Sequence, residues 1–310
     1  MHTYAPIGVC DNNLQSQSQQ RKMASNLNHS NLDILINRAL AIEDETALDA
    51  DALGFMARAM VQATLPHSKV EGNEFTRKNG NYSLTILSPS AIGLPYGSVP
   101  RLLLAWVTTE AVKTKSRELE LGDSLSGFMR ELDLVPTGGR WGSITRLKEQ
   151  TKRLFASSIT AVYEQGQGTQ IINQAVADRA VFWWHPKDPN QTALWKSSIN
   201  LTETFYKEII DRPVPIDMRA IKALKKSPMA LDIYTWLTYR MSYLKRPTAI
   251  PWTSLAMQFG SNYSHIRNFK LAFLGEMKKV VTVYGGVQVE VMPTGLLVKP
   301  SLTHIPRKDS

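Results

Sequence analysis

The chain has 310 residues, of which 43% are hydrophobic, enough for one or two globular cores. Its 36 Lys and Arg residues outnumber its 27 Asp and Glu residues, and residues 61–310 carry the whole surplus, which favours a polyanionic partner. The single cysteine excludes a disulfide within the chain and a cysteine-based zinc site, and no apolar run approaches the roughly 18 residues of a membrane span.

The N-terminal part of the chain is predicted to precede the DNA-binding units. Residues 1–30 are rich in Gln, Ser and Asn, which predicts a disordered tail. This tail lacks the charged-then-apolar pattern of a signal peptide, so we expect a cytoplasmic protein. Residues 31–90 are predicted to form a helical segment and a linker; helical composition extends to residue 65, and residues 82–87 alternate like a strand.

Residues 91–190 have the element order of a winged helix, a helix-turn-helix with a β-hairpin attached. Pro100 favours a helix start, Gly122-Asp123 precede a second helix, and a Pro-Thr-Gly-Gly turn breaks that helix before a basic one. In chain order the sequence predicts a helix over 101–113, a strand over 118–121, helices over 124–134 and 144–157, and a hairpin over 159–164 and 169–173.

The same order recurs in residues 191–300 without sequence repetition. The sequence predicts a strand over 196–201, helices over 203–210 and 229–244, a short strand at 249–250, helices over 254–259 and 262–279, and a hairpin over 280–284 and 287–292. We therefore predict an α+β fold with two tandem winged-helix domains after a partly disordered N-terminal segment, and a tail at residues 301–310.

The last helix of each predicted unit is basic on its outer face. In a helix-turn-helix this helix lies in the major groove, where Arg suits guanine and Asn or Gln suits adenine. The alternative is a solvated charged face. A helical wheel predicts exposed DNA contacts at Arg146, Lys148, Gln150, Lys152 and Arg153 of the first helix, and at Ser264, His265, Arg267, Asn268 and Lys270 of the second, which buries Ile266, Phe269, Phe273 and Met277.

No motif in the sequence predicts a catalytic, metal or nucleotide-binding site. The turn GGRWGS lacks the Lys-Ser/Thr ending of a phosphate-binding loop. The six histidines are scattered without metal-ligand spacing, and there is no G-x-S-x-G elbow. We expect no catalytic residue, metal or cofactor, and a protein that is not an enzyme.

Three motifs in fixed order, RLLLAWVTTEAV, TKSRELELGDSLSGFMREL and TGGRWGSITRLKEQ, closely resemble the plasmid-encoded RepA family of replication initiators. The resemblance is strongest over residues 92–184. It implies binding to repeated double-stranded origin sites (iterons), strand opening, recruitment of a host initiator or helicase, and a homodimer through the first domain. A winged-helix transcriptional repressor is the alternative, followed by an origin-specific primase or nickase.

The sequence adds two candidate surfaces for such a dimer. Residues 180–184 are apolar, and the predicted hairpin has its tip at residues 166–168. Each would leave a strand edge able to pair with a second chain.

Overall fold

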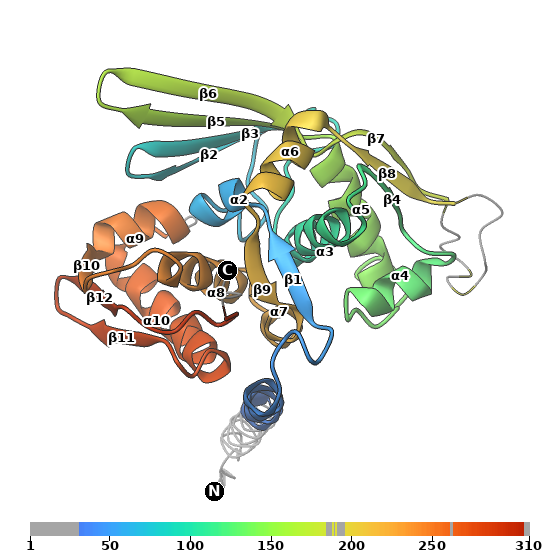
Figure 1. The fold of residues 1–310 in the computed structure, drawn as a ribbon. Coiled ribbons are helices and arrows are strands. Elements are labelled where there is room, and N and C mark those ends of the chain that lie inside the picture. The colour runs from blue at the N-terminus through green and yellow to red at the C-terminus, as the bar shows by residue number, and fades with distance from the viewer. Residues whose placement is uncertain (1–30, 184–187, 189, 191–195, 261–262, 307–310) are drawn as a thin grey trace, which may run out of the picture.

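The computed structural model describes residues 31–183, 188, 190, 196–260 and 263–306. The described residues form helices and four antiparallel sheets, an α+β fold. One group of elements contains α3 to α5 with a small sheet, and a second contains α8 to α10 with another (Figure 1). The pair of strands β1 and β9 lies between the groups, and a four-stranded sheet extends from one end.

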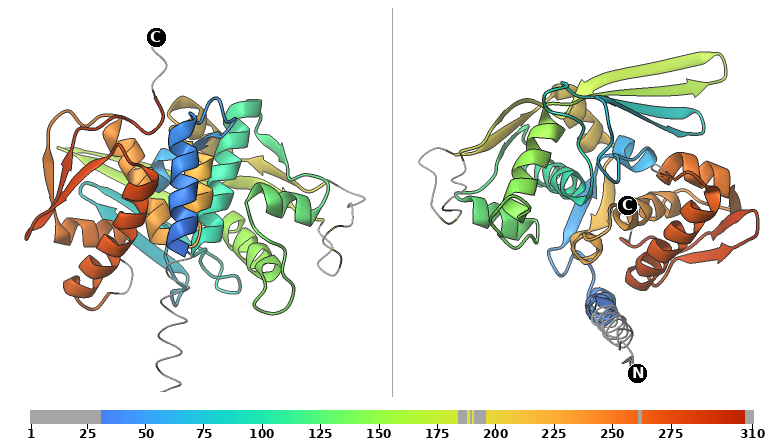
Figure 2. Two further views of the ribbon diagram at one scale, coloured as in Figure 1. Left: turned by 90° about the horizontal axis from the view of Figure 1, so that it is seen from below. Right: turned by 180° about the vertical axis from the view of Figure 1, so that it is seen from behind.

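The N-terminal segment contains more strand than its composition predicts. Residues 31–44 are helical, and in the view from below this helix lies between the two groups of elements (Figure 2). The helix predicted to extend to residue 65 is wrong, because Leu53–Met56 pair with Val214–Asp217 instead. After it come β1 (Leu53–Met56), α2 (Arg58–Gln62), β2 (Glu74–Asn79) and β3 (Tyr82–Leu87), the last of which confirms the alternating pattern.

The helices of the first unit form where the sequence predicts them. The Ser124 side chain accepts a hydrogen bond from the Gly127 amide and so caps α4. Nearly every residue of α3 over its first three turns is buried, so this helix is the centre of the unit. The unit contains α3 (Ser98–Thr114), β4 (Glu118–Glu120), α4 (Leu125–Glu131), α5 (Ser143–Phe155), β5 (Ser158–Gln165), β6 (Gly168–Ala175), β7 (Ala177–Val181) and β8 (Ser198–Leu201).

The hairpin that follows α5 belongs to a different sheet from the one that β4 joins. β5 and β6 pair with each other as predicted, but β5 also pairs with β3, giving the order β2-β3-β5-β6. β4 pairs with β8, and β8 pairs with β7. A domain boundary at residue 190 would therefore separate β7 from β8, its partner strand.

The second unit contains residues 203–299. The Ser227 side chain caps α8 by accepting from the Ala230 amide. The predicted strand over 280–284 is wrong, because α10 continues to Val283 and buries Val280 and Val283 on the face of Phe273. The elements are α6 (Glu203–Asp211), β9 (Val214–Asp217), α7 (Met218–Leu224), α8 (Pro228–Met241), β10 (Thr248–Pro251), α9 (Trp252–Phe259), α10 (Ile266–Val283), β11 (Gln288–Val291) and β12 (Gly295–Lys299).

The two small sheets have the same strand order. In the second unit β10 pairs with β12, and β12 pairs with β11. In the first unit β4, β8 and β7 occupy the corresponding places. In each sheet the strand that follows the long helix α3 or α8 pairs with the later strand of the last strand pair, so the two small sheets share one strand order. The first unit differs by the inserted hairpin β5–β6, which belongs to the four-stranded sheet.

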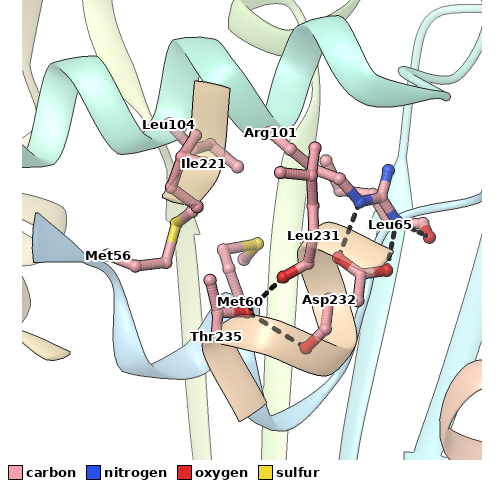
Figure 3. A pocket seen from close by; sticks show the side chains of 9 residues that line it. All are labelled: Met56, Met60, Leu65, Arg101, Leu104, Ile221, Leu231, Asp232 and Thr235. Carbon is pink, nitrogen blue, oxygen red and sulfur yellow. Dashed lines mark hydrogen bonds and ion pairs between the residues drawn. The ribbon is translucent and has the colours of Figure 1, made fainter. Parts of the chain in front are cut away.

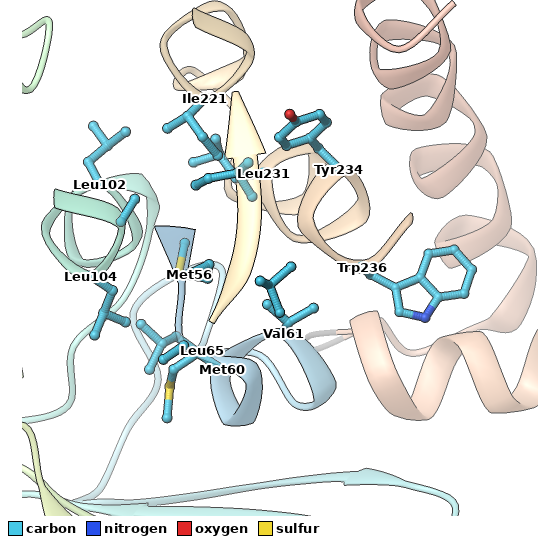
Figure 4. Packing of buried hydrophobic residues seen from close by; sticks show 14 of the residues in the cluster. Met56, Met60, Val61, Leu65, Leu102, Leu104, Ile221, Leu231, Tyr234 and Trp236 are labelled. Carbon is cyan, nitrogen blue, oxygen red and sulfur yellow. The ribbon is translucent and has the colours of Figure 1, made fainter. Parts of the chain in front are cut away.

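One hydrophobic core extends through both units. Figure 4 shows Met56, Met60 and Leu65 between Leu104 of α3 and Leu231 of α8. The segments that precede α3 in the sequence therefore fill the space between the units, and apolar burial stabilises the units against each other.

A buried ionic cluster lies at the same place, and we call Arg101, Asp232 and His67 the joint. Arg101 of α3 donates from Nε and Nη2 to the Asp232 carboxylate of α8, at 2.6 and 2.7 Å (Figure 3). His67 Nε2 lies 2.7 Å from the same carboxylate. Arg101 also donates to the carbonyls of Leu65, Pro66 and Gly97. The adjoining cavity of about 10 Å³ has room for no more than a water, so the joint is structural.

Burial and charge oppose each other at the joint. Burial alone would raise the pKa of Asp232, but Arg101 and His67 hold that pKa below its usual value, so the carboxylate is ionised. Burial lowers the pKa of His67, despite its contact with Asp232. Asp232 is thus a permanent counter-ion to Arg101 between the units.

Candidate nucleic-acid interface

Helix α5 presents cations on its exposed face. Ile144, Leu147 and Leu154 are buried in the core, which turns Arg146, Lys148, Glu149 and Lys152 toward solvent. Three of these four side chains are cationic. The predicted exposure of Arg146, Lys148 and Lys152 therefore agrees with the structure, while their contact with DNA stays a prediction.

The predicted outward positions of Gln150 and Arg153 are wrong. Gln150 is buried, with 5% of its surface exposed, and its Oε1 accepts from the Tyr96 amide at 2.8 Å. Arg153 is half-buried; it donates to the Leu94 carbonyl, and its guanidinium lies 5.5 Å from the Tyr96 ring centroid. The segment before α3 covers this side of α5, a tertiary contact that helical periodicity does not contain.

The turn between α4 and α5 is tied to the start of α5. Thr137 Oγ1 accepts from the Ser143 amide, and Ser143 Oγ accepts from the Thr137 amide, each at 2.9 Å. Thr145 Oγ1 donates to the Gly139 carbonyl at 2.9 Å. These reciprocal bonds fix the position of the first turn of α5 relative to α4.

Helix α10 begins later than predicted, at Ile266, and residues 261–262 lie outside the described residues. Ser264, His265, Arg267 and Asn268 are exposed, as predicted. Ile266, predicted to be buried, is 48% exposed because Trp252, Phe259, Phe269 and Phe273 already fill the core beneath the helix.

Lys270 differs from its neighbours on α10. It is half-buried, and its Nζ lies 4.8 Å from the centroid of the Trp252 ring. This cation–π contact holds the side chain against α9. The lysine therefore links the two helices that adjoin the turn of the second unit.

Sequence reasoning missed cations that lie near α5 in space but not in sequence. A cavity of about 590 Å³ lies between α5 and the start of α3, with Lys69, Arg146, Lys225 and Lys226 in its lining. Lys225 is paired with Asp133 at 2.6 Å. The Lys-Lys pair before α8 was visible in the sequence, but only the fold places it beside α5.

The described part of the chain contains no group of three or more His, Cys, Asp or Glu side chains placed to hold a metal ion. None of its helices is both long and apolar enough to cross a membrane.

Comparison with known proteins gives a family and a fold. The family model described as "Plasmid encoded RepA protein" matches residues 94–253. A crystal structure of selenomethionine derivatives of domains 2 and 3 of RctB is similar, with a TM-score of 0.50 and 10% identity over 76% of this chain and 95% of that chain. A second RctB structure of these domains gives a TM-score of 0.48 and 11% identity over 78% and 96%. At these identities the likeness shows the fold alone, and no curated protein sequence matches.

Proposed function

The chain belongs to the plasmid-encoded RepA family, and from this premise we propose that it is a plasmid replication initiator that binds repeated sites in the origin. The observation that carries the proposal is the shared strand order of the two small sheets, with an exposed basic or polar helix, α5 or α10, at the same point in the element order of each unit. In this proposal the protein needs no cofactor and no catalytic residue of its own.

We propose further that both units are winged helices. Support comes from the order helix, strand, helix, helix, strand pair. In the first unit β7 and β8 complete this order after the inserted hairpin β5–β6, and in the second unit β11 and β12 complete it directly. In a winged helix the third helix lies in the major groove. That role falls to α5 and α10.

The DNA contacts divide by chemistry. Lys148 and Lys152 of α5 suit phosphates, and Arg146 suits a guanine edge. On α10, Arg267 and Asn268 suit guanine and adenine, with Ser264 and His265 beside them at the start of the helix. Strand opening would draw on this binding free energy, because deforming a site costs about 1–10 kcal/mol. Recruitment of a host initiator or helicase would follow.

A salt titration tests the α5 contacts. Lys152 is exposed, so Lys152→Ala should leave folding unchanged and reduce the slope of log K against log salt concentration by about 0.9, the value for one phosphate. Lys207→Ala is the control, because Lys207 is equally a helix lysine, 68% exposed and paired with Glu203 on α6. Binding of the wild type that does not depend on salt would contradict the proposal.

Two experiments separate the proposed function from its rivals. A footprint on DNA flanking the native gene should show protected repeats. A plasmid carrying only this gene and that DNA should replicate. Protection without replication would favour the transcriptional repressor, and primer synthesis or nicking by the purified protein would favour the enzyme.

We also propose a homodimer through the first unit. β6 is an edge strand of the four-stranded sheet, with Ile171 60% exposed and Ile172 37% exposed. β7 is an edge strand of the β4-β8-β7 sheet, although Trp184, part of the predicted apolar segment, lies outside the described residues. Exposed apolar edges favour strand pairing with a second chain.

A charge on β6 tests this interface. Ile171→Lys should convert a wild-type dimer to a monomer that still folds and melts cooperatively, because the side chain is exposed in the monomer. Leu302→Lys, at a residue that is 85% exposed elsewhere, should leave the dimer intact. Analytical ultracentrifugation with thermal melting reads both results. A folded Ile171→Lys variant that stays dimeric would place the interface elsewhere.

A further inference from the structure

The turn between α4 and α5 holds a tryptophan in solvent. Trp141 is 81% exposed, the largest exposed fraction of any aromatic side chain among the described residues. Its ring contacts the guanidinium of Arg140, which lies 5.1 Å from the ring centroid. The free energy falls when another surface covers an exposed aromatic ring. An aromatic ring that the protein itself leaves uncovered therefore indicates a binding partner.

The turn that carries Trp141 is tightly closed. Gly142 sits so close to the preceding backbone that an added Cβ would lie 2.2 Å from the Thr137 carbonyl oxygen. The Gly142 amide donates to the Gly139 carbonyl at 3.1 Å, which closes the turn around Arg140 and Trp141. Together with the Thr137–Ser143 bonds, this geometry fixes the backbone of the turn at the start of α5, where the Trp141 ring is exposed.

The surroundings of Trp141 favour a nucleic acid over an apolar protein surface. Arg140 adjoins the ring, and the helix that follows, whose Arg146, Lys148 and Lys152 are assigned above to the duplex, adds positive charge nearby. Val135, 75% exposed, is the only other large apolar side chain exposed in this turn. A protein-docking patch is a contiguous apolar area, whereas one ring among cations has the composition of a site where a base stacks and its phosphates are neutralised.

We propose that Trp141, with Arg140 on its ring, stacks on an unpaired base of single-stranded DNA. The flat faces of bases are covered by their neighbours in a duplex, and they become accessible when strands separate. The inference rests on the proposed function, because an initiator that opens its origin exposes such bases next to its bound site. In this proposal Trp141, a residue of the first unit, binds one strand of the opened origin.

The test compares single-stranded and duplex binding by the full-length protein. The probes are an oligothymidine of about 15 nucleotides and the duplex that the footprint identifies. Trp141→Ala should weaken oligothymidine binding by about 5- to 150-fold, the equivalent of one stacked base, and leave duplex binding within about 3-fold. Trp141→Phe should retain most of the affinity.

Tyr243→Ala is the matched control. Tyr243 is 49% exposed and carries its own arginine, Arg240, 5.7 Å from the ring centroid, at the end of α8. This variant should bind both probes as the wild type does. Thermal melting checks that all variants are folded.

Three results would overturn the inference: oligothymidine binding that Trp141→Ala does not change, an equal loss on both probes, or a wild type that does not bind oligothymidine. Failure of the proposed function would look different. The wild type would then show no sequence-specific duplex binding, while the effect of Trp141→Ala on oligothymidine would still be measurable.

Discussion

Asp232→Ala should destabilise the protein by about 3–5 kcal/mol, because it leaves the Arg101 guanidinium buried without its counter-ion. Asp232 accepts two hydrogen bonds from Arg101 and contacts His67, and the side chains of Arg101 and Asp232 are only 4% and 8% exposed. The Arg101 bonds to backbone carbonyls add no negative charge. Urea unfolding should show the loss as a lower midpoint.

An exposed pair gives the control for Asp232. Asp178 lies 3.0 Å from Arg117, and the two side chains are 55% and 38% exposed. Asp178→Ala should cost less than about 1 kcal/mol, because water replaces the lost partner. If the two variants unfolded at the same urea concentration, the joint would not be the stabilising contact that its geometry indicates.

Phe273→Ala should cost a similar amount, about 3–5 kcal/mol, through the cavity it leaves. Phe273 is fully buried in α10, and its ring centroid lies 5.5 Å from those of Phe259 and Phe269 and 6.1 Å from that of Trp252. These rings hold α9 and α10 together. Loss of one should therefore also reduce DNA affinity at temperatures where the wild type is still folded.

The same helix supplies a control for Phe273. Leu271 lies two residues earlier and is 76% exposed. Leu271→Ala should change the free energy of unfolding by no more than about 0.5 kcal/mol. Thermal melting and DNA titration of the two variants separate the packing effect from a general weakness of α10. Equal losses in both variants would contradict the packing account.

The sequence predicts helices better than it predicts strand partners. The apolar spacing of α4 and α5 and the Ser caps of α4 and α8 are local signals, and these helices form where the signals lie. The hairpin β5–β6 is also local, but its attachment to β3 is not. The alternating pattern of β5 and β6 is compatible with pairing to β3 or with pairing to the sheet of β4. Only the packing of the whole chain selects β3.

The candidate site shows the same division. The exposure of Arg146, Lys148, Arg267 and Asn268 follows from the helical wheel. The burial of Gln150 does not, because it depends on the Tyr96 amide, 54 residues earlier. The exposure of Ile266 at the start of α10 also depends on tertiary packing. Four aromatic rings, which come from both α9 and α10, already fill the core beneath the helix.

Under the proposed function, the joint restricts the spacing of the DNA segments that the two units can contact together. α3 belongs to one unit and α8 to the other, and the bond between Arg101 and Asp232 fixes these two helices to each other. A pair of domains on a flexible tether tolerates gaps of different lengths between its two half-sites. Two units that are fixed to each other do not tolerate such variation. Every origin repeat contacted by both α5 and α10 should therefore have the same number of base pairs between its two contacted segments, even where the intervening bases differ.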